Sequence, residues 1–189
     1  MNYAYREQGS HVMSWRTQWT LDNPVRGMLQ SPQKMFGHLV EPGMTVIDTG
    51  CGTGFFTMAL ARMVGESGKV IAVDLQAEAL VKLEKKVENA GLHRRVETWK
   101  CDAEDIGVLP KADFVLSAYM AHEVPDINIY FHRMAQCVKR NSRMLLVEPK
   151  FHVSPNSYRE EVAAAIKAGF ELDSLPSIFF SHAVILRRG

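Results

Sequence analysis

Three acidic residues follow three successive apolar runs, and the first of them opens a loop in which glycines alternate. Asp48 lies near the end of the β-branched run Thr45–Gly50, and Gly50, Gly52 and Gly54 follow at every second position. A ligand that lies against backbone requires residues without side chains there, and a tight strand-to-helix turn often requires the positive φ that glycine adopts readily. A helix that begins directly after such a loop offers free N–H groups to an anionic part of the ligand. The segment therefore predicts a loop that binds a ligand through its backbone.

Two further acids suit a nucleoside. Asp74 closes the run Lys69–Asp74, about 20 residues beyond the loop, where a carboxylate can accept hydrogen bonds from both hydroxyls of a ribose. Asp102 closes the run VETWKCD, where it can accept from an adenine amino group. The pattern DxGxGxG departs from the dinucleotide fingerprint GxGxxG, since its third glycine comes one place early and Phe55 stands where that fingerprint has Gly or Ala. An NAD-linked oxidoreductase remains the alternative.

The rest of the chain predicts the elements that position these residues. Short strand-like runs alternate with longer stretches of helical periodicity. The expected strands are 45–50, 69–74, 96–102, 113–119, 143–148, 170–175 and 182–188, and the expected helices are 55–65, 77–91, 128–138 and 157–170. This alternation favours right-handed βαβ units and a mostly parallel sheet with helices on both faces. Ligands of such sheets bind in the crevice at the carboxyl ends of the strands.

At these motifs the chain resembles a known family, the class I S-adenosylmethionine-dependent methyltransferases. The motifs are VIDTGCGTG, IAVDLQ, CDAEDI, FVLSAYMAHEVPD and LLVEPK, within residues 44–189. Among members of the family, the chain is most similar to small stand-alone enzymes related to the quinone-biosynthesis C-methyltransferases. The resemblance implies a Rossmann-like, doubly wound sheet of seven strands in the order 3-2-1-4-5-7-6, with strand 7 antiparallel. The final run HAVILRR suits that last strand.

The resemblance also implies how S-adenosylmethionine would be bound. The glycine loop would hold the methionine part, with Asp48 beside its ammonium, and Asp74 would hold the ribose. The implied cofactor-binding residues are Asp48, Gly50, Cys51, Gly52, Gly54, Asp74, Leu75, Asp102, Ala103, Ser117 and Ala118. Of these, Leu75 would pack near the adenine, Asp102 and Ala103 would contact its edge, and Ser117 and Ala118 would border the sulfonium.

Acceptor contacts are expected after the fourth and fifth strands, at the same edge of the sheet. Methyl transfer mainly requires that the acceptor be aligned and water excluded, and a base helps where the acceptor must lose a proton. We expect His122 and His152 to be catalytic, since an imidazole titrates near neutrality. We expect Tyr119, Glu148 and Lys150 to bind the acceptor.

The first residues differ from the rest in pattern. Trp15 and Trp19 lie among polar residues without a strand signal. We interpret residues 1–41 as a helical cap or lid whose two tryptophans contact the acceptor, and residues 42–189 as the S-adenosylmethionine-binding methyltransferase domain. The competing interpretation is a packed helix face, because the tryptophans are spaced at i and i+4.

Composition excludes other classes of protein. The 189 residues suit one domain, and 22 basic against 21 acidic residues give a net charge of +1, without the basic field expected of a nucleic-acid-binding protein. Three scattered cysteines without a CxxC, and histidines without HxH or HxxxH spacing, predict neither a disulfide framework nor a metal site. No signal peptide or membrane span is expected, and reduced thiols favour the cytoplasm.

The sequence therefore predicts an S-adenosylmethionine-dependent methyltransferase that acts on a small-molecule acceptor. A non-catalytic module that binds S-adenosylmethionine remains a second alternative. The methylated atom (carbon, oxygen, nitrogen or sulfur) and the oligomeric state stay open.

Overall fold

The computed structural model describes residues 31–189, so Trp15 and Trp19 lie outside the described residues. The strands are β1 (Thr45–Thr49), β2 (Lys69–Asp74), β3 (Val96–Lys100), β4 (Ala112–Ala118), β5 (Val138–Pro149), β6 (Phe170–Ser174) and β7 (Ser181–Arg188). The helices are α3 (Pro32–Phe36), α4 (Phe55–Met63), α5 (Ala77–Asn89), the 3₁₀ turn η2 (Ala121–Glu123), α6 (Ile127–Cys137) and α7 (Pro155–Lys167).

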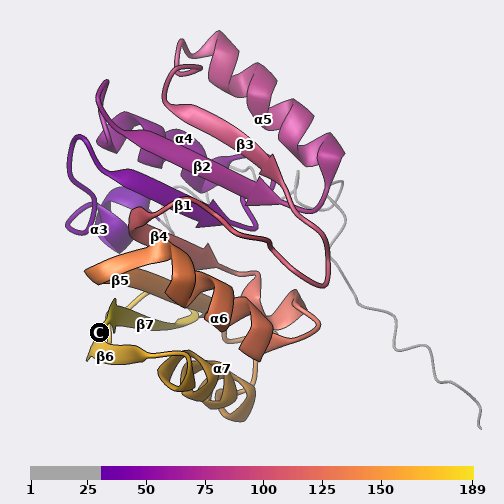
Figure 1. Ribbon diagram of the computed structural model, residues 1–189, viewed down its shortest axis with the longest axis vertical. Coiled ribbons are helices and arrows are strands. Elements are labelled where there is room, and N and C mark those ends of the chain that lie inside the picture. Colours follow the sequence, from indigo (N-terminus) through magenta and orange to yellow (C-terminus); the bar gives the residue numbers. More distant parts are fainter. Residues whose placement is uncertain (1–30) are drawn as a thin grey trace, which may run out of the picture.

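The seven strands form one sheet in the order β3-β2-β1-β4-β5-β7-β6 (Figure 1). β1 to β5 pair in parallel, and β7 is antiparallel to both of its neighbours. The expected Rossmann-like, doubly wound sheet with its antiparallel strand 7 is therefore confirmed. The β-branched and apolar runs form the central strands because both of their faces are covered by helices.

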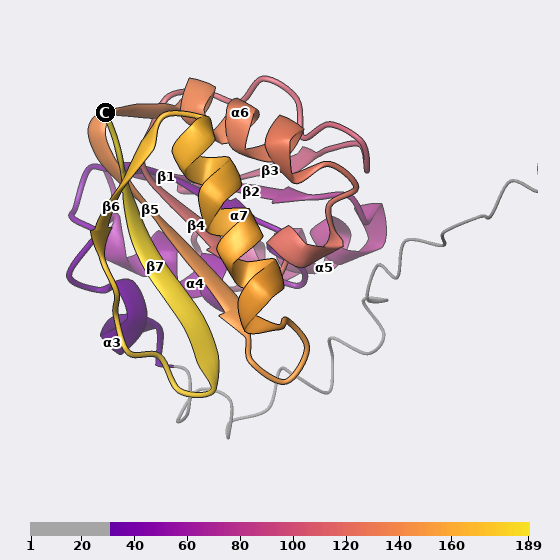
Figure 2. The same ribbon diagram turned by 90° about the horizontal axis from the view of Figure 1, so that it is seen from below.

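Helices lie on both faces of the sheet (Figure 2), and an apolar layer fills the space between the sheet and the helices on each face. One contains Phe36 of α3, Leu60 of α4 and Leu83 of α5, which pack against the β1–β2–β4 face. The other contains Phe131 of α6 and Ala165 of α7. Side chains alternate between the two layers along each strand, as the period of two requires.

α3 contributes to the first of these layers. Met35 and Phe36 are buried, and the Phe36 ring contacts Phe56 edge-on at 5.7 Å between centroids. This part of the 1–41 segment therefore belongs to the packed core of the domain. The role of the residues before it stays a proposal.

β5 begins earlier than the expected run from Arg143. It follows α6 directly at Val138, and its ladder with β4 is irregular between Ala112 and Phe114. Asn141 in this stretch has φ 63, a conformation that asparagine adopts more readily than most residues. The bulge accommodates extra residues that period-two patterning does not reveal.

The parallel strands bring the acidic motifs to one edge. Thr49 of β1 is paired with Val73 of β2 on one side and with Ser117 of β4 on the other. Because β1, β2 and β4 run in the same direction, their carboxyl ends lie next to one another. The glycine loop, Asp74 and the segment after β4 therefore meet at this edge.

Candidate functional site

A cleft opens at the carboxyl edge of the sheet and passes across β1. It is lined by the glycine loop, the β2 end, the loop after β3, the segment after β4 and the first turn of α6. The lining residues are Gly50, Cys51, Gly52, Thr53, Phe55, Phe56, Asp74, Leu75, Gln76, Cys101, Asp102, Ala103, Glu104, Asp105, Ile106, Ala118, Tyr119, Met120, Glu123, Val124, Pro125, Asp126, Ile129 and Tyr130.

The glycine loop adopts the conformations that its sequence suggests. Gly50, Gly52 and Gly54 have φ of 67, 53 and 91, all in the left-handed region. A Cβ on Gly50 would lie 2.6 Å from the Cβ of Met120, and one on Gly54 would collide with Leu83 Cδ1. Both positions are therefore closed to side chains by space as well as by φ. Gly54 is the N-cap of α4, so the free N–H groups of that helix begin at the loop.

Asp74 connects β2 to the glycine loop. Its Oδ2 accepts a hydrogen bond from the Gly52 backbone N–H at 2.7 Å, and its Oδ1 accepts one from Gln76 N–H at 2.8 Å. Burial raises the pKa of Asp74, against the opposing effect of the backbone hydrogen bonds. The carboxylate is thus fixed in the wall of the cleft, as a ribose-binding acid would be.

Asp48 lies in the protein interior. It is 1% exposed, does not line the cleft, and accepts a hydrogen bond from Thr57 Oγ1 at 2.6 Å. Burial raises its pKa to about 7, partly opposed by the Thr57 hydrogen bond and increased by the charge of Asp74. A carboxyl at this depth would ionise more readily beside a cation.

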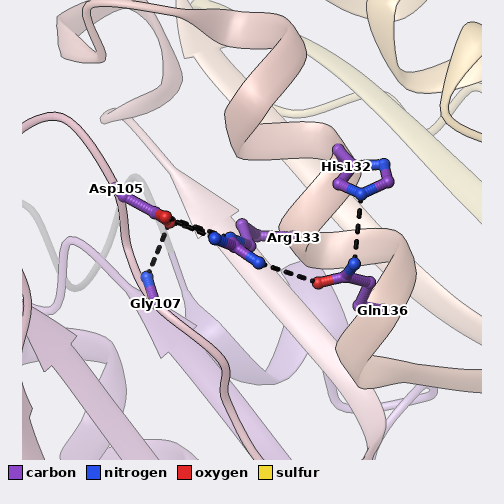
Figure 3. A network of polar contacts seen from close by, with 5 residues as sticks. All are labelled: Asp105, Gly107, His132, Arg133 and Gln136. Atoms are coloured by element: carbon purple, nitrogen blue, oxygen red, sulfur yellow. Dashed lines mark hydrogen bonds and ion pairs between the residues drawn. The ribbon is translucent and has the colours of Figure 1, made fainter.

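The loop after β3 forms another wall of the cleft and is anchored to α6. Asp105 accepts hydrogen bonds from Arg133 Nη2 at 2.6 Å and from Gly107 N–H at 2.9 Å. Arg133 also donates a hydrogen bond from Nη1 to Gln136 Oε1 (Figure 3). The Arg133 hydrogen bond lowers the pKa of Asp105 to about 2. The same loop carries Asp102 and Ala103 into the cleft lining.

Both thiols beside the cleft are protonated groups. Burial raises the pKa of Cys101 to about 11 and that of Cys51 well above its ordinary value. Cys51 is held by its backbone N–H, which donates to Val73 O at 3.0 Å. Neither has the low pKa of a nucleophilic thiol.

The segment after β4 contains a strained residue. Tyr119 has φ 62, its ring is stacked on Phe56, and its hydroxyl lies 3.0 Å from Ser181 Oγ. A non-glycine residue in this region requires support from its surroundings. These contacts provide it and hold Tyr119 in the cleft wall next to Ala118. Ser117 is fully buried behind the lining, with its hydroxyl 3.3 Å from Met120 Sδ.

The expected acceptor residues divide into two groups. Tyr119 lines the cleft, whereas His122, Glu148, Lys150 and His152 are not part of its lining. His122 Nδ1 lies 2.5 Å from Glu148 Oε2, and the His122 and His152 rings meet edge-on at 4.9 Å between centroids. Lys150 is exposed and donates its backbone N–H to Phe180 O.

Of the expected cofactor residues, the structure brings eight together in the cleft: Gly50, Cys51, Gly52, Asp74, Leu75, Asp102, Ala103 and Ala118. Asp48, Gly54 and Ser117 lie behind the lining. The cleft is also lined by three residues at the start of α6 that were not predicted from the sequence: Asp126, Ile129 and Tyr130. The topology could have predicted them, because the helix that follows β4 must begin at the edge of the sheet where the cleft opens.

The described residues contain no helix that is long and apolar enough to span a bilayer. Over the same residues, no group of His, Cys, Asp and Glu side chains has the arrangement of a metal site.

The fold and the cleft define a class I S-adenosylmethionine-dependent methyltransferase domain. The family model described as "Methyltransferase domain" matches residues 40–178, and the chain belongs to this family.

Curated proteins of similar sequence are also methyltransferases. A demethylmenaquinone methyltransferase from Lactobacillus johnsonii is 28% identical over 125 residues, which are 65% of this chain and 51% of the relative. Another from Bacillus cereus is 32% identical over 110 residues, 58% of this chain and 46% of the relative. The chain thus spans about half the length of the curated relatives it matches.

Solved structures share the fold over a larger part of the chain. An S-adenosylmethionine-dependent methyltransferase from Aquifex aeolicus has a TM-score of 0.82 and 27% identity, and the match covers 93% of this chain and 98% of that one. An O-methyltransferase from Thermotoga maritima has a TM-score of 0.66 at 23% identity, with 83% of this chain and 64% of that one covered, which shows the fold alone.

Proposed function

We propose that this protein transfers a methyl group from S-adenosylmethionine to a small organic acceptor without anionic groups. The observation that carries the proposal is the continuity of the cleft. It begins at Asp102 and Asp74, crosses the glycine loop and ends at Tyr119 and Glu123. One site can therefore hold the cofactor and an acceptor next to each other, which is what an in-line displacement needs.

The residues present fit the cofactor. Gly50 and Gly52 line the cleft without side chains, and the Gly52 N–H holds the Asp74 carboxylate in the cleft wall. Asp74 would hold the ribose, the Asp102–Ala103 backbone and Leu75 would enclose the adenine, and Asp48 would compensate the ammonium from below the loop. When bound, S-adenosylmethionine supplies a methyl group on a sulfonium sulfur, which keeps the bonding electron pair as the methyl leaves.

The charge of the cleft supports an acceptor without phosphate or carboxylate groups. Its described lining contains six carboxylates, Asp74, Asp102, Glu104, Asp105, Glu123 and Asp126, and no Lys or Arg side chain. An anionic acceptor would be repelled by such a wall, and the phosphates of a nucleic acid would find no basic partner there. A small molecule is therefore the better-supported substrate class.

The walls at the acceptor end are largely apolar. Tyr119, Met120, Val124, Pro125 and Ile129 line the cleft together with Glu123. Apolar walls with one polar group suit an organic ring or chain that carries a single ionisable group. The curated relatives, which are named for demethylmenaquinone, support an acceptor of this general kind.

The histidines and the first residues complete the proposal. His122 is the imidazole that receives the acceptor's proton, and His152 packs against it. Lys150 and Glu148 border this end of the sheet rather than the cleft. Residues before α3, with Trp15 and Trp19, would cover the acceptor and exclude water. Three free cysteines are consistent with a reducing compartment, which supports the cytoplasm.

Binding and turnover measurements test the proposal. Calorimetry should show binding of S-adenosylmethionine and S-adenosylhomocysteine but not of NAD. A panel of thiols, phenols, quinols and amines should contain an acceptor that releases S-adenosylhomocysteine, whereas phosphorylated analogues of that acceptor should react poorly. Binding of NAD in place of S-adenosylmethionine would overturn the cofactor assignment. Tight cofactor binding without turnover of any acceptor would favour a non-catalytic binding module.

A further inference from the structure

A group of polar side chains lies behind the cleft wall, between η2, the end of β5 and the turn after it, α7 and the start of β7. Its members are His122, Glu148, His152, Tyr158, Glu161 and His182. Glu148 and His182 are paired in the β5–β7 ladder, so they share a face of the sheet, and Tyr158 stacks on His182 at 4.9 Å. Glu148 and Glu161 are buried, His122, Tyr158 and His182 are partly buried, and His152 is exposed. We call these six residues the polar group.

The polar group contains four buried atoms without a hydrogen-bond partner. In residues 31–189, the buried side-chain nitrogen and oxygen atoms without a hydrogen-bond partner are His122 Nε2, Tyr158 Oη, Glu161 Oε2 and His182 Nε2. All four belong to this one group. An unpaired buried polar atom costs about 1–3 kcal/mol, so their concentration makes this group a candidate for a functional role.

Glu148 fixes the orientation of His122. Glu148 is fully buried, and its Oε1 accepts a hydrogen bond from the Ala121 backbone N–H at 2.8 Å. Its Oε2 is hydrogen-bonded to His122 Nδ1. The two bonds lock η2 and the imidazole ring together. The opposite ring nitrogen, Nε2, is therefore directed away from Glu148, and it lies 3.9 Å from Glu123 Oε1.

Glu123 is the member of this chain of contacts that reaches the cleft. Its side chain is 19% exposed and lines the acceptor end beside Tyr119 and Val124, whereas His122 lies behind it. An acceptor in the cleft would therefore meet the Glu123 carboxylate before the imidazole.

We propose that Glu123 takes the proton of the acceptor and passes it to His122, which Glu148 holds in position. The inference rests on the proposed methyl transfer, which it deepens by naming the side chain that touches the acceptor. Glu148 acts through His122 and is a positioning residue.

The proton balance is simple. A neutral acceptor that gains a methyl cation must lose one proton. The Glu123 carboxylate accepts this proton and becomes a carboxylic acid. That acid then donates the proton to His122 Nε2, which restores the carboxylate and leaves an imidazolium next to the Glu148 charge. The 3.9 Å between Glu123 Oε1 and His122 Nε2 must shorten for this step, as catalytic hydrogen bonds often do when substrate binds.

The surroundings of His122 determine the pH range in which its imidazole can accept a proton. The titratable groups that act on it are Glu123 on η2, Glu148 on β5, His152 in the following turn and Glu161 on α7. His182 of β7 is paired with Glu148, and Tyr158 of α7 stacks on His182. Burial lowers the pKa of His122, but the hydrogen bond to Glu148 and the charges of Glu148, Glu123 and Glu161 raise it above its ordinary value. His122 is therefore neutral and able to accept only above this raised pKa, so turnover should rise with pH through it.

The first test needs neither cofactor nor acceptor. The His122 ring is titrated by NMR in the wild-type protein, with the His122→Asn variant to assign its signal. We expect a pKa above 6.5 that falls by about one unit or more in the Glu148→Gln variant, since an opposite charge at this distance shifts a pKa by about 1–3 units. A wild-type pKa below the ordinary value, or an unchanged value in the folded variant, would overturn the positioning by Glu148.

The second test measures turnover with the acceptor found in the screen. Glu123→Gln should lower kcat about 10²-fold or more while cofactor affinity changes only a few-fold, because it removes the base and not the binding loop. Glu148→Gln should shift the inflection of the pH–rate profile downward in parallel with the NMR value. Glu160→Gln, an exposed carboxylate on α7, is the matched control and should change neither.

The outcomes separate this inference from the proposed function. Absence of cofactor binding and turnover in the wild type would refute the methyl transfer, and the NMR titration would still test the Glu148–His122 pair. Full turnover in the Glu123→Gln variant would overturn the proton transfer while methyl transfer stands. If Glu148→Gln does not fold, Glu123→Gln at the partly exposed cleft wall still decides the question.

Discussion

The Asp74 carboxylate accepts a hydrogen bond from the Gly52 backbone N–H at 2.7 Å and so connects the end of β2 to the glycine loop after β1. Two motifs that lie 22 positions apart in the chain thereby form one surface. The same carboxylate is the one proposed to hold the ribose. Its position is therefore set before any ligand arrives, which lowers the ordering cost of binding.

Replacement of Asp74 should weaken cofactor binding. Asp74→Ala should lower S-adenosylmethionine affinity about 10- to 100-fold, because charge-assisted hydrogen bonds are each worth about 1.5–3 kcal/mol. Asp74→Asn, which keeps the shape, should lose less. Calorimetry measures both, with Asp173→Ala on β6 as a control far from the cleft. Unchanged affinity in a folded Asp74→Ala protein would contradict the ribose assignment.

A branched side chain in the glycine loop should abolish cofactor binding. Gly52 has φ 53 and lines the cleft, so Gly52→Val places bulk where the ligand meets backbone and strains φ as well. Gly91→Ala is the matched control, since Gly91 has φ 68 but no atom near its Cβ position and no place in the cleft. Both variants should fold by circular dichroism, and only Gly52→Val should lose binding. Normal affinity in that variant would show that the loop is only a turn.

Glu161 should make the protein less stable as pH rises. Burial, aided by the charge of Glu148, raises its pKa to about 8. The folded state then binds a proton that the unfolded state has released, so the free energy of unfolding falls between about pH 4.5 and pH 8. The loss should amount to a few kcal/mol, since each pKa unit is worth about 1.4 kcal/mol.

Glu161→Gln should remove this part of the pH dependence. Denaturant unfolding at pH 5, 7 and 9 measures the free energy of unfolding of both proteins. The free energy of unfolding of the variant, relative to that of the wild type, should increase with pH. Asp48, whose pKa is raised to about 7, retains its own contribution in both proteins. Equal slopes for the two proteins would mean that Glu161 ionises normally in the folded state.

Removal of the first twenty residues tests the lid. The deletion ends well before α3, whose Phe36 belongs to the core, so folding should be preserved. Cofactor affinity should stay within a few-fold, and turnover should fall because water enters the acceptor site. Methylation at the full rate by the truncated protein would remove the lid from the mechanism.

Much of the fold could be predicted from the sequence because it depends on local pattern. Apolar runs such as Val70–Val73 must be covered on both faces, and the charged face of Ala77–Asn89 must meet water. The alternation of the two kinds of run leaves few topologies for a right-handed parallel sheet. Glycines at alternate positions likewise predicted a left-handed loop, which Gly50, Gly52 and Gly54 form.

The acceptor end could not be predicted in the same way. His122 and Glu123 are neighbours in the sequence, and of the two only His122 was predicted as a base. Only the packing of η2 against β5 directs one to the Glu148 carboxylate and the other to the cleft. That choice depends on Glu148, 26 positions away along the chain, which no periodicity connects to either residue.

Local backbone preferences and side-chain patterns specify the succession of strands and helices, the cofactor loop and the acids at the strand ends, so these could be predicted from the sequence. Which polar groups are buried became clear only from the folded structure. Glu148, Glu161 and Asp48 look like ordinary surface or strand-end acids in the sequence, yet they are almost completely buried. Burial depends on contacts between distant segments, and it is burial that raises the pKa of Asp48 and Glu161.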